Sequence, residues 1–187
     1  MKPRIIDKNL EFSFENGPAE LSNIRYFVIH HTGTEKRQGI NIIHDYHKNT
    51  RGWAGVGYHF YIRRSGKIYK GRKLNWKGVH DAEKNAVSLG IALEGNFNNE
   101  DPTNDQYEAL ARLLNWLEDQ YDHAEITNHD AGCPGSNFSF KKLEEKMASD
   151  VVAPGFNIPS EAEEVAKYGL YAVVGGLLLL VFGAGDD

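Results

Sequence analysis

The sequence is poor in cysteine, since its 187 residues include only Cys133. A single thiol cannot form an internal disulfide, so the fold does not depend on an oxidising compartment. Basic residues are not in excess either, because 21 Lys and Arg stand against 26 Asp and Glu. No basic stripe points to a nucleic-acid partner, and none is expected. The first residues lack an apolar run, so we expect no cleavable secretion signal.

The C-terminal residues lack charge over a long stretch. No charged residue occurs from Tyr168 to Gly185, and Ala172–Phe182 is strongly apolar. A helix of about 18 residues spans roughly 27 Å, close to the thickness of the hydrocarbon core of a bilayer. The sequence therefore predicts a transmembrane helix within residues 166–187, which contacts a lipid membrane through residues 168–185. The alternative is a helix buried in the domain or docked on it.

The residues before this tail carry the periodicities of both strands and helices. Short apolar or alternating runs indicate strands, and apolar residues three or four apart indicate helices. The predicted elements are a strand over 25–30, a helix over 40–49, a hairpin over 58–69, a strand over 86–95, and helices over 103–121 and 140–147. We expect the domain boundaries to be an N-terminal extension (1–22), a folded domain (23–148), a linker (149–165) and the C-terminal anchor (166–187).

Cys133 and two histidines have the chemistry of a metal site. Cys133 follows His129 by four positions, and His30 ends a predicted strand. Two imidazoles and one thiolate bind zinc and leave its fourth position open to water, as in catalytic rather than structural zinc sites. The alternative is that the histidines are partly buried polar residues and Cys133 is an inert apolar side chain. A second pair, His44 and His47, lies three apart on a predicted helix and is equally explained as a solvated helix face.

Several motifs in a fixed order identify a family. The segment Tyr26-Phe-Val-Ile-His30-His31-Thr-Gly resembles the opening strand of the zinc-dependent N-acetylmuramoyl-L-alanine amidases, which include bacteriophage lysozyme-type amidases and peptidoglycan recognition proteins. The resemblance covers about residues 24–147. Its further elements are, in order, His47, Gly52-Trp53, Val56-Gly57-Tyr58-His59-Phe60, Gly66-Lys-Ile-Tyr69, Gly71-Arg72, His80, Asn85, Ser88-Leu-Gly90-Ile91, Gly95-Asn96, His129 and Cys133-Pro134-Gly135.

This resemblance implies an α/β fold with a mixed central β-sheet flanked by helices. It also implies that the protein cleaves the amide between N-acetylmuramic acid and the first L-alanine of peptidoglycan, with one Zn²⁺ ion as cofactor. His30, His129 and Cys133 match the zinc ligands of the family, and Tyr58 matches its catalytic tyrosine. The residues expected to bind substrate are His31, Trp53, Trp76, His80 and Asn85.

The chain departs from the family pattern near the cysteine. The family commonly places about eight residues between its second histidine and its cysteine, with a lysine or threonine two positions before the cysteine. Here the spacing is four, and that position holds Ala131. The candidates for the missing side chain are His31, His80, Lys84 and Glu94. Asp130 is a candidate for orienting a ligand histidine.

Two other functions fit parts of the sequence. Some relatives bind peptidoglycan without cleaving it, and Ala131 keeps that alternative open. A cysteine peptidase with Cys133 as nucleophile is disfavoured, because Pro134 removes the backbone N–H that such sites often use in the oxyanion hole. The combination of this domain with an apolar tail predicts a bacteriophage protein that acts in lysis or entry, anchored in the virion membrane or the host inner membrane.

Overall fold

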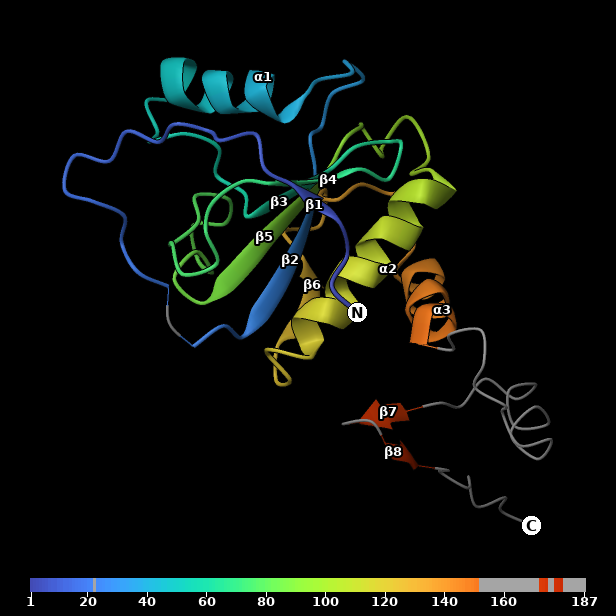
Figure 1. Cartoon of the computed structure of the whole chain (residues 1–187). Helices are drawn as coiled ribbons and strands as arrows, with labels where there is room; N and C mark the ends of the chain where they lie inside the picture. Colours follow the sequence, from blue (N-terminus) through green and yellow to red (C-terminus); the bar gives the residue numbers. More distant parts are fainter. Residues whose placement is uncertain (22, 152–171, 175–176, 180–187) are drawn as a thin grey trace, which may run out of the picture. The chain divides into compact units, whose positions relative to one another are not determined.

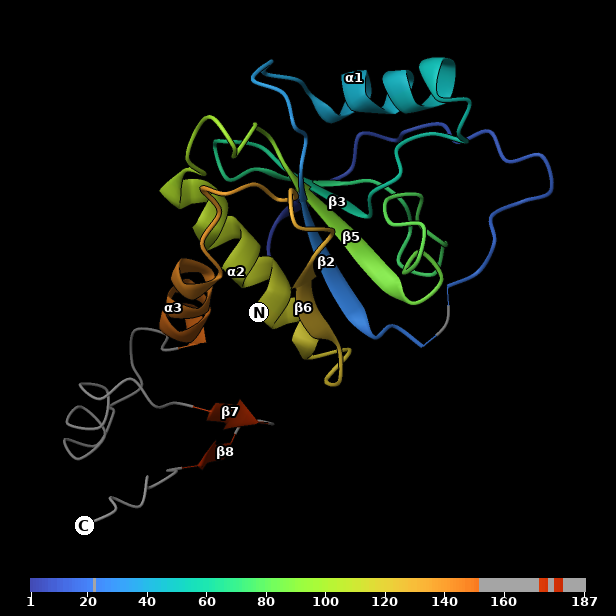
Figure 2. The same ribbon diagram turned by 180° about the vertical axis from the view of Figure 1, so that it is seen from behind.

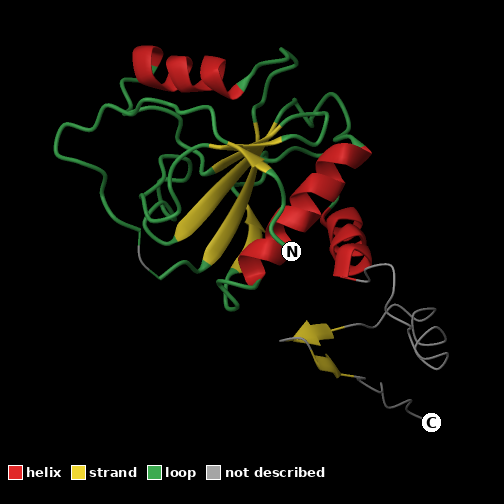
Figure 3. Cartoon of the chain, in the orientation of Figure 1, coloured by secondary structure: helices red, strands yellow, loops and turns green. Residues whose placement is uncertain are grey.

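The computed structural model describes residues 1–21, 23–151, 172–174 and 177–179. The chain divides into two compact units, residues 1–151 and 152–187. The first unit contains the α/β fold (Figure 3). Its elements are β1 (Ile5–Ile6), β2 (Tyr26–His31), α1 (Ile40–Asp45), the π-helical turn η1 (Tyr46–Thr50), β3 (Phe60–Ile62), β4 (Ile68–Lys70), β5 (Ser88–Leu93), α2 (Asn104–Glu118), β6 (Glu125–Asn128) and α3 (Phe140–Val151).

A six-stranded mixed sheet forms the centre of this unit. The strand order is β1-β4-β3-β5-β2-β6. The β3–β4 pair is antiparallel, as expected for the predicted hairpin, and the other pairs are parallel. Helices α2 and α3 lie on one face of the sheet, and α1 lies on the other (Figure 1). The mixed, helix-flanked sheet predicted from the sequence is therefore confirmed.

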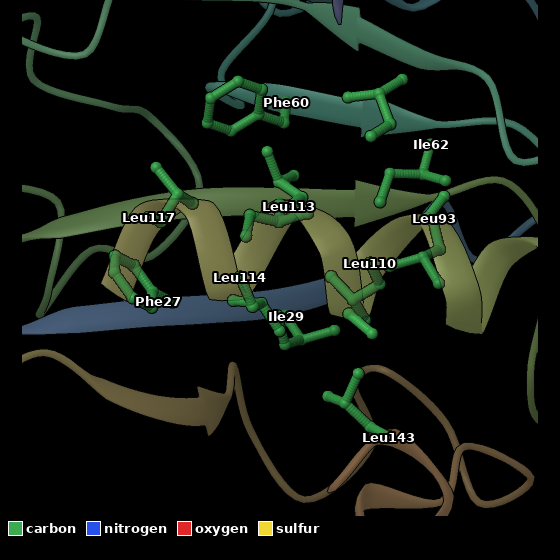
Figure 4. Packing of buried hydrophobic residues seen from close by; sticks show 14 of the residues in the cluster. Phe27, Ile29, Phe60, Ile62, Leu93, Leu110, Leu113, Leu114, Leu117 and Leu143 are labelled. Atoms are coloured by element: carbon green, nitrogen blue, oxygen red, sulfur yellow. The ribbon is translucent and has the colours of Figure 1, made fainter. Parts of the chain in front are cut away.

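The alternation of side chains along β2 and β5 gives the sheet two different faces. Phe27 and Ile29 of β2 join the large core under α2, where the helix contributes its leucines (Figure 4). Because successive side chains of a strand point to opposite faces, His30 belongs to the face that α1 covers. On that face Ile40 and Ile43 of α1 pack with Tyr61, Ala92 and Val56. The view from behind shows the same arrangement (Figure 2).

The helix over residues 103–121 begins as the sequence predicts. The Thr103 side chain accepts a hydrogen bond from the backbone N–H of Gln106, and the Gln106 side chain accepts one from the N–H of Thr103. This capping box satisfies two backbone donors at the start of α2. The helix then presents its leucines to the sheet and stabilises the strands that position the site.

Three features of the first unit lie outside the predicted elements. Strand β6 has only four residues, and β1 only two, so neither carries a clear periodic signal. β1 pairs with β4, which brings part of the N-terminal extension into the sheet. Helix α3 continues to Val151, into the segment interpreted as a linker.

The second unit contains the predicted membrane anchor, most of which lies outside the described residues. The described part consists of strands β7 (Ala172–Val174) and β8 (Leu177–Leu179), paired antiparallel. These six residues are therefore extended where the sequence predicts a helix, and the β-branched Val173 and Val174 favour that conformation. Within the described ranges, no helix has both the length and the apolar character of a membrane span.

Candidate metal centre

The ends of two parallel strands bring two histidines together. His30 lies near the end of β2, and His129 directly follows β6. The register pairs Ile29 with Asn128, so the next residue of each strand lies beside the other. The two imidazole ring centroids are 4.8 Å apart. A rigid sheet edge therefore positions both rings.

A tight turn returns the chain from His129 to Cys133. The backbone N–H of Cys133 donates to the Asp130 carbonyl at 3.3 Å, and the Gly132 N–H donates to Asp130 Oδ1 at 2.7 Å. The Cys133 Sγ lies 3.8 Å from His30 Nδ1. One ligand atom from each of His30, His129 and Cys133 lies within 4.8 Å of the other two. The short spacing therefore still brings the three side chains together.

The electrostatics around Cys133 and His30 disfavour a cysteine nucleophile. Burial raises the pKa of Cys133 to about 11 and lowers the pKa of His30 to about 3. A neutral thiol beside a neutral imidazole is the opposite of the thiolate–imidazolium pair that a cysteine nucleophile needs. A bound metal ion inverts this preference by stabilising the thiolate, and it binds neutral imidazoles. The donor set of two nitrogens and one sulfur is one that zinc takes.

His80 contacts the His30 ring at Nε2, the nitrogen that does not face Cys133. His30 Nε2 and His80 Nδ1 are 3.1 Å apart, which leaves His30 Nδ1 facing Cys133. His80 Nε2 is buried and has no hydrogen-bond partner among the described residues. The ring fits because Gly90 of β5 has no side chain: a Cβ there would overlap with the His80 ring. His80 thus contacts a candidate ligand from behind.

His129 lies close to a carboxylate of the loop. Its Nδ1 lies 3.4 Å from Asp130 Oδ2. The sequence had marked Asp130 as a candidate for this role. Such contacts fix the tautomer and ring orientation of metal-binding histidines.

The three candidate ligands line a cavity of about 410 Å³. Of the predicted substrate-binding residues, His31, Trp53 and His80 line this cavity, and Trp76 and Asn85 do not. Trp76 packs instead against aromatic rings of the N-terminal segment, and Asn85 Oδ1 accepts the backbone N–H of His80 at 2.8 Å.

Tyr58 lines the cavity beside the ligands. Its ring centroid lies 5.3 Å from that of His30. Burial raises the pKa of Tyr58 to about 12, so its hydroxyl stays protonated at neutral pH. A protonated hydroxyl at this position can donate a hydrogen bond to a bound carbonyl oxygen.

Comparison with known proteins identifies the family. Residues 20–136 match the family described as N-acetylmuramoyl-L-alanine amidase. The chain belongs to this amidase family. It is 32% identical over 130 residues to peptidoglycan-recognition protein SC1a of Drosophila melanogaster, covering 61% of this chain and 69% of that protein.

Two solved structures extend the likeness to the whole domain. The endolysin N-acetylmuramoyl-L-alanine amidase LysCS of Clostridium intestinale URNW has 36% identity and a TM-score of 0.71, covering 79% of this chain and 97% of that one. The Ph2119 endolysin from the bacteriophage Ph2119 of Thermus scotoductus MAT2119 has 28% identity and a TM-score of 0.65, covering 77% and 99%. The family predicted from the motifs is confirmed.

The alternative histidine pair, His44 and His47, is not part of the candidate ligand group. His44 Nδ1 and His47 Nδ1 each accept a backbone N–H, from Val56 and Gly57 respectively. Neither residue belongs to the three-residue metal-binding group found in the described part of the chain. The motif comparison included His47, but the site prediction missed that it lines the cavity.

Ala131 is exposed, and its methyl group cannot supply the hydrogen bond of the family's lysine or threonine. Glu94 is bound to Arg63 at 3.1 Å, and Lys84 is bound to Asp81 at 3.0 Å, so both have other partners. Arg51 lines the cavity, and the site prediction did not include it. The sequence signals Arg51 only by its position two residues before Trp53. In the structure the Arg51 guanidinium lies 5.7 Å from the centre of the Trp53 ring.

Proposed function

We propose that this protein is a zinc-dependent hydrolase that cleaves the amide between N-acetylmuramic acid and L-alanine in peptidoglycan. The observation that carries the proposal is the convergence of His30, His129 and Cys133 beside the protonated Tyr58 in an open cavity. The family match and the two endolysin neighbours support the same reaction.

We assign the zinc ligands to His30 Nδ1, His129 and Cys133 Sγ, because one ligand atom from each lies within 4.8 Å of the other two and Cys133 Sγ faces His30 Nδ1. Zinc bound by three protein ligands supplies a Lewis acid and lowers the pKa of bound water towards about 7. The chain's own contribution is to hold the three ligands on rigid strand ends and a tight turn, so that little ordering remains to be done when the metal binds.

Tyr58 is assigned to stabilise the negative charge that develops on the substrate. A tyrosine hydroxyl is protonated at neutral pH and burial raises its pKa further, so Tyr58 donates to the carbonyl oxygen as negative charge develops there. His31 is a further donor, because its Nδ1 accepts the Phe97 N–H at 3.0 Å and its proton therefore resides on Nε2. His31 and Trp53 line the cavity and are assigned to substrate binding.

Recognition of peptidoglycan without cleavage is the second candidate function. The observation that favours it is Ala131, which lacks the side chain that family members use near the transition state. An enzyme and a binding module share the fold and the groove, so only a chemical assay separates them.

The test combines metal analysis with an assay for peptide release. Wild-type protein should contain one zinc ion per chain and release free stem peptide from purified cell walls, and a chelator should abolish the release. Cys133→Ser should lose most of the zinc and the activity, because it replaces a thiolate ligand. Bound zinc without peptide release would leave the recognition function, and release that survives chelation would exclude the zinc mechanism.

We further propose, from the sequence, that residues 166–187 anchor the protein in a lipid membrane of a bacteriophage system, in the virion or the host inner membrane. The support is the absence of charge from Tyr168 to Gly185 and the bacteriophage endolysin among the similar structures. The full chain should float with phospholipid vesicles, whereas a chain ending at residue 165 should not. Equal behaviour of the two would refute the anchor, and absence from purified virions would refute the entry role.

A further inference from the structure

A second cavity lies beside the cavity of the metal centre. It measures about 360 Å³ and shares Trp53 and Val79 with the cavity of the metal centre. The two cavities therefore adjoin at Trp53 and Val79.

The N-terminal segment forms one side of the second cavity. Phe14 and Ala19 line it, and both precede residue 20, where the family match begins. The Ser13 N–H donates to the Ala54 carbonyl at 2.9 Å, and the Lys77 N–H donates to the Ala19 carbonyl at 2.8 Å. The segment is thus fixed at both ends to the residues that frame the cavity.

Aromatic stacking holds the segment in place between these two points. The Phe12 and Phe14 rings lie 5.4 and 5.1 Å from the Trp76 ring, both edge-on. Their rings also lie 5.7 and 5.5 Å from the Arg72 guanidinium. Both phenylalanines therefore contact Trp76 and Arg72, but Phe12 also packs edge-on against His44 at 5.0 Å, and only Phe14 lines the cavity.

The charges of the cavity indicate an anionic ligand. Arg72 and Lys77 line it, and no acidic residue does so among the described residues. The Arg72 side chain is buried and donates only to the carbonyls of Val56 and Lys77, without a carboxylate partner in the described part of the chain. A buried cation without a counter-ion is costly, and an incoming carboxylate relieves that cost. The peptide that follows the scissile amide carries carboxylates, whereas neutral amino sugars do not.

We propose that residues 12–19 are a wall of the subsite for the stem peptide, with Phe14 as a specificity-determining residue. This inference rests on the proposed function, because it takes peptidoglycan as the substrate. The wall comes from outside residues 20–136, the segment that matches the family.

The test compares Phe14→Ala with Phe12→Ala in the zinc-loaded full chain. Both variants lose one phenyl ring from Trp76 and Arg72, but only Phe14→Ala opens the cavity. Calorimetry with a free stem tripeptide should show binding weakened by about tenfold in Phe14→Ala and less than about twofold in Phe12→Ala. In parallel, kcat/KM for a muramoyl tripeptide relative to a muramoyl dipeptide should fall in Phe14→Ala alone.

Phe14→Trp keeps an aromatic ring on Trp76 and narrows the cavity, so it tests the same point if Phe14→Ala does not fold. Equal tripeptide affinity in wild type and the Phe14 variants, or equal losses in the Phe12 and Phe14 variants, would overturn the subsite. Tripeptide binding that depends on Phe14 without any hydrolysis would preserve the subsite and reject the hydrolase. Hydrolysis that is insensitive to Phe14 would preserve the hydrolase and reject the subsite.

Discussion

The contact between His80 and His30 predicts that a residue outside the ligand set controls metal affinity. Burial lowers the pKa of His30 to about 3 and holds the pKa of His80 well below its ordinary value, so both rings are neutral at pH 7. With His30 Nδ1 directed to the metal, the proton of His30 lies on Nε2 and is donated to His80 Nδ1 at 3.1 Å. His80 therefore fixes both the tautomer and the ring orientation of a zinc ligand.

Replacing His80 by leucine removes the acceptor and leaves a buried N–H on His30. Loss of such a contact typically costs about 10- to 100-fold in metal affinity, which agrees with about 1–3 kcal/mol for an unsatisfied buried donor. His80→Asn is the matched control, because its Oδ1 can accept the same proton. We expect competition with a chromogenic chelator to show weaker zinc binding in His80→Leu and partial recovery in His80→Asn.

Unfolding of the metal-free variants separates this effect from a general loss of stability. If the metal-free His80→Leu chain is folded and binds zinc as tightly as wild type, the reasoning about His30 is wrong. The same holds if the leucine and asparagine variants lose equal affinity, because the acceptor would then be irrelevant.

Two further predictions concern chemistry and stability. Tyr58→Phe should retain zinc and lose about 100-fold or more in kcat, as for removal of one oxyanion donor; unchanged peptide release from cell walls would exclude Tyr58 from the reaction. Hydrogen bonds from Arg37 lower the pKa of Glu100 to about 2, so the Glu100 carboxylate stabilises the fold above its unfolded pKa near 4.5, and this stability is lost as the pH falls towards 2. The Arg37 side chain is half exposed, which reduces the effect to about 1 kcal/mol. Urea unfolding should therefore show Glu100→Gln less stable than wild type at pH 7 and equal to it near pH 2, and a difference that persists in acid would contradict the assignment.

The sequence determined the elements whose signal is local. The apolar run that became β2, the hairpin of β3 and β4, and the capped helix α2 each have a pattern complete within a few turns or alternations. The order of the motifs also identified the family, and the family match over residues 20–136 agrees with it. Short segments such as β6 carry too few residues for a periodic pattern, so their place in the sheet could not be predicted.

Tertiary structure decided which atoms meet. His30 and Cys133 are 103 positions apart, and only the parallel register of β2 and β6 together with the Asp130 turn brings them within 3.8 Å. The motifs named His80 but did not place it behind a metal ligand, and they did not single out Phe14, which lines the second cavity. Those positions follow from the packing of segments that are distant in the chain, and no local pattern records such packing. The types of the candidate ligands, two histidines and one cysteine, could be read from the sequence.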